Sequence, residues 1–226
     1  MTEAEWLKDQ FPHARALLEF LGAEASPRKL RYFLVACAKR VLPADADTVT
    51  VEALATAEQF ADGAVPKSAL KRAREAVTAT HPARAKRWPA LYSGHIRSVP
   101  AWHANREQIV RGAREGAWCA VWSSTRLHAN GWDRLDREYV AQSALLRDIF
   151  GNPFRVPVFA PEWRTGTATA IAAQMYKSRD FGAMPILADA LQDAGCDSED
   201  VLNHCRDTSQ VHVRGCWVVD LVLGQS

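Results

Sequence analysis

The stretch Asp133–Pro153, DRLDREYVAQSALLRDIFGNP, decides the fold class of this chain. Its large side chains recur every three or four residues, which is the period of an amphipathic helix. The face consists of Leu135, Tyr139, Gln142, Leu146 and Ile149. Asp133 is a suitable cap for the first turn, and Gly151-Asn152-Pro153 is a turn that cannot continue a helix. The stretch therefore predicts a long helix that begins at Asp133 and stops at Gly151.

The helical period extends over most of the remaining chain. Ser26-Pro27, for example, combines a capping hydroxyl with a proline at the first helical position. Helices are predicted over residues 27–42, 50–62, 67–77, 100–122, 168–176, 186–194 and 198–202. A short extended segment near 156–159 or 216–223 is an alternative that periodicity does not decide. We therefore predict an all-α fold, a multi-helix globular bundle.

The 226 residues are enough for one large domain or two small ones. Residues 81–99 contain two prolines and a glycine without a sustained period, which is typical of a long connection or a functional loop. We predict a single composite helical domain over residues 1–226. The alternative is a division into an N-terminal helical unit, 1–80, and a C-terminal helical unit, 100–226.

The composition argues against a membrane protein and against a secreted disulfide scaffold. Apolar residues make up 48% of the chain and charged ones 24%, as in an ordinary globular protein. No apolar run approaches the ~20 residues that cross a bilayer, and the acidic Glu3, Glu5 and Asp9 do not fit an export signal. Five cysteines are an odd number for a disulfide scaffold. We expect a cytoplasmic protein with reduced thiols, outside the membrane.

Several catalytic motifs are missing from the sequence. There is no G-x-x-x-x-G-K-[ST], no G-x-G-x-x-G after a strand, no H-E-x-x-H and no G-x-S-x-G. Nucleotide hydrolysis, dinucleotide redox chemistry and the standard metalloprotease and esterase reactions are thereby disfavoured. We predict no organic cofactor.

Cysteine and histidine gather near the C-terminus. Thiolate and imidazole are ligands that zinc prefers, and four of them in a tetrahedral array close a structural site. Cys196, Cys205, His212 and Cys216 form one such set. His212 and Cys216 share a face if residues 212–216 form one helical turn, and His204 can replace Cys205, because neighbouring helical residues point in different directions. The set predicts a zinc site, although it contains no C-x-x-C knuckle.

Two other interpretations apply to the same residues. Cysteine is among the most buried residue types, so the sequence favours ordinary reduced core thiols. A thiolate–imidazole nucleophile is the third interpretation, with Cys205 or Cys216 as the attacking group and His204 or His212 as the base. No cysteine-hydrolase signature surrounds these residues, which makes catalysis the weakest of the three.

Residues 67–114 carry a local excess of positive charge. They hold eleven basic side chains against two acidic ones, a net +9, whereas the whole chain carries +2. Cations interleaved with aromatic rings can neutralise phosphates and stack on bases, although a solvated helix face has the same composition. The candidate contacts for a nucleic acid or another partner are Lys67, Lys71, Arg74, Arg84, Lys86, Arg87 and Trp88.

Several blocks of the sequence are shared with one family. They are MTEAEWL (1–7), LLRDIFGNPFR (145–155) and, above all, the C-terminal series DAGC (193–196), HC (204–205) and HVRGCWVVDL (212–221). The chain thereby resembles a large paralogous family of uncharacterised bacterial helical proteins. Many members carry paired cysteines and two arginines where this chain has Cys37-Ala38-Lys39-Arg40, which weakens a metal site there. The resemblance implies a small cytosolic helical protein that acts as an adaptor or regulatory module.

These observations lead to one functional hypothesis and two alternatives. We predict a non-catalytic cytosolic interaction or regulatory module that binds a protein partner. The first alternative is a zinc-stabilised nucleic-acid-binding protein that uses the basic region 67–114. The second is a thiol- or metal-dependent enzyme of unrecognised class.

Overall fold

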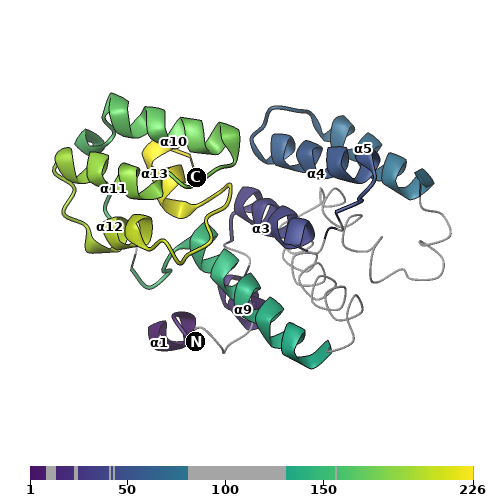
Figure 1. The fold of residues 1–226 in the computed structure, drawn as a ribbon, viewed down its shortest axis with the longest axis horizontal. Helices are drawn as coiled ribbons and strands as arrows, with labels where there is room; N and C mark the ends of the chain where they lie inside the picture. The colour runs from purple at the N-terminus through teal and green to yellow at the C-terminus, as the bar shows by residue number, and fades with distance from the viewer. Residues whose placement is uncertain are drawn as a thin grey trace. The chain divides into compact units, whose positions relative to one another are not determined.

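The computed structural model of the chain describes residues 1–8, 14–22, 25–40, 42, 44–80, 131–155 and 157–225 (Figure 1). Within these ranges every regular element is a helix and no strand is present. The all-α prediction is therefore confirmed for the described part of the chain. The predicted helix over 100–122 and the connection 81–99 lie outside it. No helix in the described ranges has both the length and the apolar character needed to cross a bilayer.

The chain divides into two compact units, Met1–Ser143 (unit 1) and Ala144–Ser226 (unit 2). The division falls inside helix α9 (Gly131–Phe150), which begins two residues before Asp133, the predicted cap. It does not coincide with the alternative boundary considered between residues 80 and 100. The single composite domain stays a prediction.

Unit 1 is a group of helices whose apolar faces form its core. Its helices are α1 (Glu3–Trp6), α2 (Ala14–Leu21), α3 (Pro27–Arg40), α4 (Thr48–Ala61), α5 (Lys67–Thr80) and the larger part of α9. Helix α4 packs against both α3 and α5. The largest fully buried side chains of the unit are Trp6, Leu17, Leu18, Leu30, Tyr32, Phe33, Leu34, Leu54 and Leu70. On α3, Leu30, Phe33 and Leu34 recur at helical spacing, so this helix presents an apolar stripe to the core.

One helix start in unit 1 agrees with its prediction from the sequence, and another lies two residues earlier than predicted. Helix α3 begins at Pro27, as the Ser26-Pro27 pair predicts. Helix α4 begins at Thr48 rather than at Thr50, because the carboxylate of Asp47 accepts the Thr50 N–H and caps the helix earlier.

The C-terminal end of α3 carries two cations that pair with buried carboxylates. Lys39 forms an ion pair with Glu58 of α4, and Arg40 forms one with Glu138 of α9 at 3.1 Å. The Glu58 and Glu138 side chains are only 5% and 6% exposed, so each carboxylate needs a partner. Gln142 donates a further hydrogen bond to Glu138. These contacts link α3 to α4 and α9.

Unit 2 contains the end of α9 and a second group of helices. They are the 3-10 helix η2 (Pro161–Trp163), α10 (Gly166–Ser178), α11 (Met184–Asp193), α12 (Glu199–Arg206) and α13 (Trp217–Leu223). Helices α10 and α12 each contact both α11 and α13. The buried apolar side chains of the unit include Leu145, Leu146, Ile149, Ala172, Met175, Leu187, Leu191, Val201 and Val218.

The segment 217–223 forms a helix, whereas its sequence was compatible with either a helix or a short strand. Helix α13 begins directly after Cys216, and the Asp220 N–H donates to the Cys216 carbonyl at 2.9 Å. The apolar run is therefore a buried helix and not a strand. Residues 157–159 of the other candidate segment form no strand either, and residue 156 lies outside the described ranges.

Candidate metal centre

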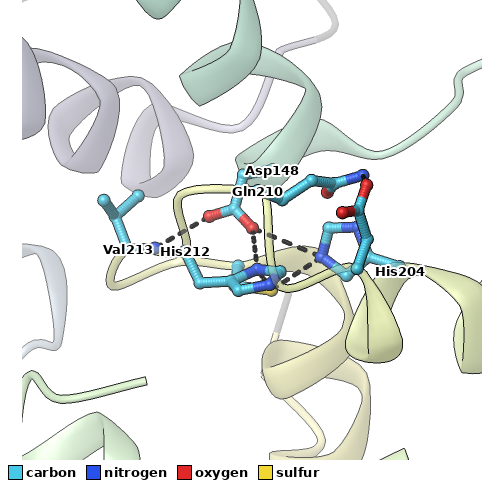
Figure 2. A network of polar contacts seen from close by, with 7 residues as sticks. Asp148, His204, Gln210, His212 and Val213 are labelled. Atoms are coloured by element: carbon cyan, nitrogen blue, oxygen red, sulfur yellow. Dashed lines mark hydrogen bonds and ion pairs between the residues drawn. The ribbon is translucent and has the colours of Figure 1, made fainter. Parts of the chain in front are cut away.

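Four side chains with metal-binding atoms meet inside unit 2 (Figure 2). Asp148 comes from the last turn of α9, His204 from α12, and His212 and Cys216 from the segment that connects α12 to α13. Their donor atoms all lie within 4.8 Å of one another. We call these four residues the Asp148 cluster.

The helices place Asp148 and His204 beside their apolar stripes. On α9, Leu145 is buried, and Asp148 lies about 60° from it around the helix axis. On α12, Val201 and Cys205 are buried, and His204 lies about 60° from Val201 in the same way. Both polar side chains therefore lie along the edge of the core, where they meet without displacing apolar residues.

A tight turn brings His212 and Cys216 together. The Cys216 N–H donates to the Val213 carbonyl at 3.0 Å, and Gly215, at the third position of the turn, has a φ of +88°. This matches a type II turn, whose third position requires a positive φ and favours glycine. Residues 213–216 therefore form this turn, so the condition of one helical turn over 212–216 is not met. The type II turn still leaves the Cys216 Sγ atom 4.0 Å from His212 Nδ1.

The donor atoms converge on one point. The Asp148 Oδ1 atom lies 2.8 Å from His212 Nδ1 and 3.3 Å from His204 Nε2. The Cys216 Sγ atom lies 3.2 Å from the same His204 Nε2 and 4.0 Å from the same His212 Nδ1. Each imidazole therefore directs one nitrogen at both the carboxylate and the sulfur.

Further contacts orient the cluster. The second oxygen of Asp148, Oδ2, accepts the Val213 N–H at 2.9 Å and is thereby fixed to the turn (Figure 2). The two imidazole rings pack edge to face, with their centroids 4.9 Å apart. Among the described residues the buried His212 Nε2 atom has no hydrogen-bond partner. The polar contacts of this ring are therefore made through Nδ1.

The cluster is closed to solvent. The side chains of Asp148, His204 and His212 are 1%, 9% and 6% exposed, and Cys216 is fully buried. Burial alone would raise the pKa of the Asp148 carboxyl, but the hydrogen bonds and charges of the two histidines outweigh it and hold that pKa below its ordinary value. Burial and the nearby charge of Asp148 raise the pKa of the Cys216 thiol well above its ordinary value.

This arrangement suits a metal ion better than a proton relay. In a nucleophile–imidazole–carboxylate relay, the imidazole contacts the acid through one nitrogen and the nucleophile through the other. In the Asp148 cluster, the same nitrogen of each histidine faces both groups, so neither ring connects Cys216 to Asp148 in series. Converging nitrogen, oxygen and sulfur atoms are instead what a metal ion binds.

The Asp148 cluster overlaps with the predicted zinc set but differs from it. His212 and Cys216 occur in both, and His204 replaces Cys205, which is the substitution that the sequence left open. Cys205 lies on the buried stripe of α12, where burial raises its pKa to about 12. Cys196, a buried free thiol after α11, is also outside the cluster. Cys196 and Cys205, which the sequence predicted as zinc ligands, are therefore not among the four residues that meet in the cluster.

Asp148 is the member of the cluster that sequence analysis did not single out. No local spacing connects it to His204 or His212, because the chain between them folds into α10 and α11. One signal was present in the sequence. A carboxylate in the last turn of a helix faces the negative end of the helix dipole, so a residue such as Asp148 needs a compensating partner.

The predicted nucleic-acid or partner contacts lie partly on α5. Lys67, Lys71 and Arg74 are exposed there, and Lys71 lies 3.9 Å from the exposed Glu75. The other four predicted contacts fall outside the described residues: Arg84, Lys86, Arg87 and Trp88.

Comparisons with family models, with curated proteins and with solved structures give no match to this chain. The resemblance to a family of bacterial helical proteins stays a prediction. Functional conclusions therefore depend on the geometry of the Asp148 cluster and on the surface of α5.

Proposed function

We propose that unit 2 binds one zinc ion through Asp148, His204, His212 and Cys216, and that the chain is a non-catalytic interaction or regulatory module stabilised by this metal. The observation that carries the proposal is the convergence of four donor atoms at one buried point. Imidazole nitrogen, thiolate sulfur and carboxylate oxygen are the ligand atoms that zinc takes in proteins.

Charge balance supports a divalent ion. Deprotonated Asp148 and Cys216 bring two negative charges to the cluster, and two neutral imidazoles add none. Because the cluster is buried, uncompensated charge there is costly. A divalent cation cancels both charges and makes the occupied cluster neutral.

The spacing of the donor atoms supports four-coordinate zinc. Zinc–ligand bonds of about 2.0–2.3 Å give a tetrahedron with edges of about 3.4 to 3.6 Å. The Asp148 Oδ1 atom lies 2.8 Å from His212 Nδ1 and 3.3 Å from His204 Nε2. The Cys216 Sγ atom lies 3.2 Å from His204 Nε2 and 4.0 Å from His212 Nδ1. The spread of these four distances around the tetrahedral value is about half an ångström, which small side-chain adjustments can supply.

Closure favours a structural site over a catalytic one. A catalytic zinc keeps one position open for water or substrate, whereas four protein ligands close a structural site. The four proposed ligands all come from the chain, and the most exposed, His204, is only 9% exposed. The ion therefore joins the end of α9, α12 and the start of α13, and its binding free energy contributes to folding.

A reducing compartment such as the cytosol suits this proposal, because the four cysteines in the described part of the chain are free thiols. The role of an interaction or regulatory module with a protein partner is supported by the family resemblance, which implies helical proteins in many paralogous forms.

Elemental analysis of the untagged full-length protein tests the metal site. We expect about one zinc per chain in the wild type, and Asp148→Ala and His204→Ala should lose their zinc to a chelator that leaves the wild type loaded, because each variant removes one of the four ligands. Cys196→Ala and Cys205→Ala are matched controls, since both thiols are buried in unit 2 but outside the cluster, and both variants should keep the metal. Folded wild-type protein that takes up no zinc contradicts the proposal. If Asp148→Ala resists that chelator as well as the wild type does, the proposal is contradicted too.

Nucleic-acid binding is a second candidate function, favoured by one observation on α5. Lys67, Lys71 and Arg74 lie within about 60° of one another around the helix axis and are exposed. Three cations on one face can neutralise neighbouring phosphates. Changing all three to Gln should weaken binding of an RNA or DNA oligonucleotide. In a plot of the logarithm of the binding constant against the logarithm of the salt concentration, the slope should become less steep by about 2 to 3. Wild-type protein that binds neither oligonucleotide at low salt removes this candidate.

A further inference from the structure

Trp217 lies against the ring of His204, one of the proposed ligands. The two ring centroids are 5.2 Å apart, with the planes tilted by 55°. Trp217 is the first residue of α13 and directly follows Cys216, a second proposed ligand. Its side chain is buried, so neighbouring atoms restrict the position of the indole.

Gly151 lies close to the same indole. A Cβ atom at this position would lie 3.1 Å from the Cγ and Cδ2 atoms of Trp217 and 3.4 Å from Cδ1, which is closer than carbon atoms normally pack. Gly151 ends α9, with a φ of +69° and its N–H donated to the Arg147 carbonyl at 2.8 Å. It follows Asp148, a third proposed ligand, by three residues. A side chain at position 151 would therefore require the Trp217 ring to move by a few tenths of an ångström.

We propose that Trp217 is a positioning residue that sets the orientation of the His204 imidazole for metal binding, and that Gly151 is required because the indole must lie flat against the turn after α9. The inference rests on the proposed zinc site. A metal-binding imidazole must be held within about 10–20° of its productive orientation. A hydrogen bond from the second ring nitrogen commonly does this. Here the contact with Trp217 restrains the ring so that Nε2 faces both Asp148 Oδ1 and Cys216 Sγ.

The indole also couples three of the four ligands. It contacts His204 directly, it is the chain neighbour of Cys216, and through Gly151 it packs on the turn that follows Asp148. A shift of this one ring should therefore alter the relative positions of three donor atoms. A Trp that only filled the core would change the stability of the fold but not the coordination of a bound metal.

Gly151→Ala tests this distinction, and Gly224→Ala is its matched control. The two glycines have nearly the same φ, +69° and +66°, so alanine costs similar backbone strain at both positions. A Cβ at Gly224 meets nothing within 4 Å, whereas at Gly151 it meets the indole. We expect Gly151→Ala to lower the zinc affinity, measured by competition with a chromophoric chelator, by about 10-fold or more. Gly224→Ala should keep the wild-type affinity.

The absorption spectrum of the cobalt(II)-loaded protein supplies a readout of coordination that a purely structural role would not move. The cobalt bands should shift in Gly151→Ala and stay unchanged in Gly224→Ala. Trp217→Leu removes the aromatic contact and should behave like Gly151→Ala, whereas Trp217→Phe keeps a ring and should recover most of the affinity.

The outcomes separate this inference from the proposed function. Wild-type protein that binds neither zinc nor cobalt overturns both. Wild-type binding, together with Gly151→Ala and Trp217→Leu variants that match Gly224→Ala in affinity and spectrum, overturns the positioning role alone. If Gly151→Ala does not fold, the difference between Trp217→Leu and Trp217→Phe decides.

Discussion

Cys37 shows at the scale of one residue what burial does to a thiol. It lies in the interior of α3, where burial and the charge of Glu138 raise its pKa well above the ordinary value. Since the thiolate is the reactive form, we expect iodoacetamide at pH 8 to label Cys37 at least about 100-fold more slowly in folded protein than in urea. Peptide mapping by mass spectrometry measures both rates. Similar rates in the two conditions would show that this thiol is accessible.

The same thiol makes stability depend on pH at the alkaline end. Because the pKa of Cys37 is raised in the folded state, folded protein keeps a proton that the unfolded chain has lost. The free energy of unfolding is therefore unaffected below the ordinary thiol pKa of about 8.5 and falls as the pH rises above it. Urea unfolding at pH 7 and pH 10 should show a smaller fall in Cys37→Ala than in the wild type. An equal fall in both proteins contradicts the assignment.

At the scale of elements, the Arg40–Glu138 pair is the contact by which α3 holds a buried carboxylate of α9. Arg40→Ala removes the Arg40 guanidinium from the Glu138 carboxylate and keeps the hydrogen bond that Gln142 donates to it. We expect this change to lower the free energy of unfolding by about 2 kcal/mol, because it removes a charged partner from a buried carboxylate. Urea denaturation measures the loss.

The Arg15–Glu19 pair on α2 is a control for the Arg40 variant. Its two side chains are 64% and 46% exposed, so solvent screens the interaction. Arg15→Ala should change the free energy of unfolding by less than about 0.5 kcal/mol. Equal losses in the two variants would mean that burial of Glu138 does not matter.

Local chemistry made the helices predictable to different degrees. The Ser26-Pro27 start and the stop at Gly151 follow from capping and turn rules, and both occur in the structure. The segment 216–223 was undecidable, because its Val218-Val219 pair suits a buried strand as well as a helix. In the structure this segment is a helix that packs against α10 and α12. No local sequence pattern predicts these contacts.

At the scale of the whole molecule, the candidate site was predictable only in part. His212 and Cys216 stand in a short chemical pattern, and the exchange of Cys205 for His204 follows from the directions of neighbouring helical residues. Asp148 lies in another helix of the same unit, and no motif or spacing in the sequence indicates that it contacts the two histidines. The fold supplies that pairing by ending α9 beside the turn that contains Val213.

A zinc ion that joins α9, α12 and α13 should raise the thermal stability of the full-length protein. An ion present at about 1,000 times its dissociation constant adds about 4 kcal/mol to the folded state. We expect the unfolding transition of the metal-free wild type to rise by about 10 °C or more on addition of zinc. Metal-free Asp148→Ala should show no comparable rise, and differential scanning calorimetry records both. A wild-type transition that zinc leaves unchanged contradicts a structural role.

The central claim is the identity of the four zinc ligands, and X-ray absorption at the zinc edge of the zinc-loaded full-length protein tests it most directly. The Asp148 cluster predicts one sulfur at about 2.3 Å and three nitrogen or oxygen atoms at about 2.0–2.1 Å. A set of Cys196, Cys205, His212 and Cys216 predicts three sulfurs instead. A first shell with three sulfurs, or with none, would contradict the account.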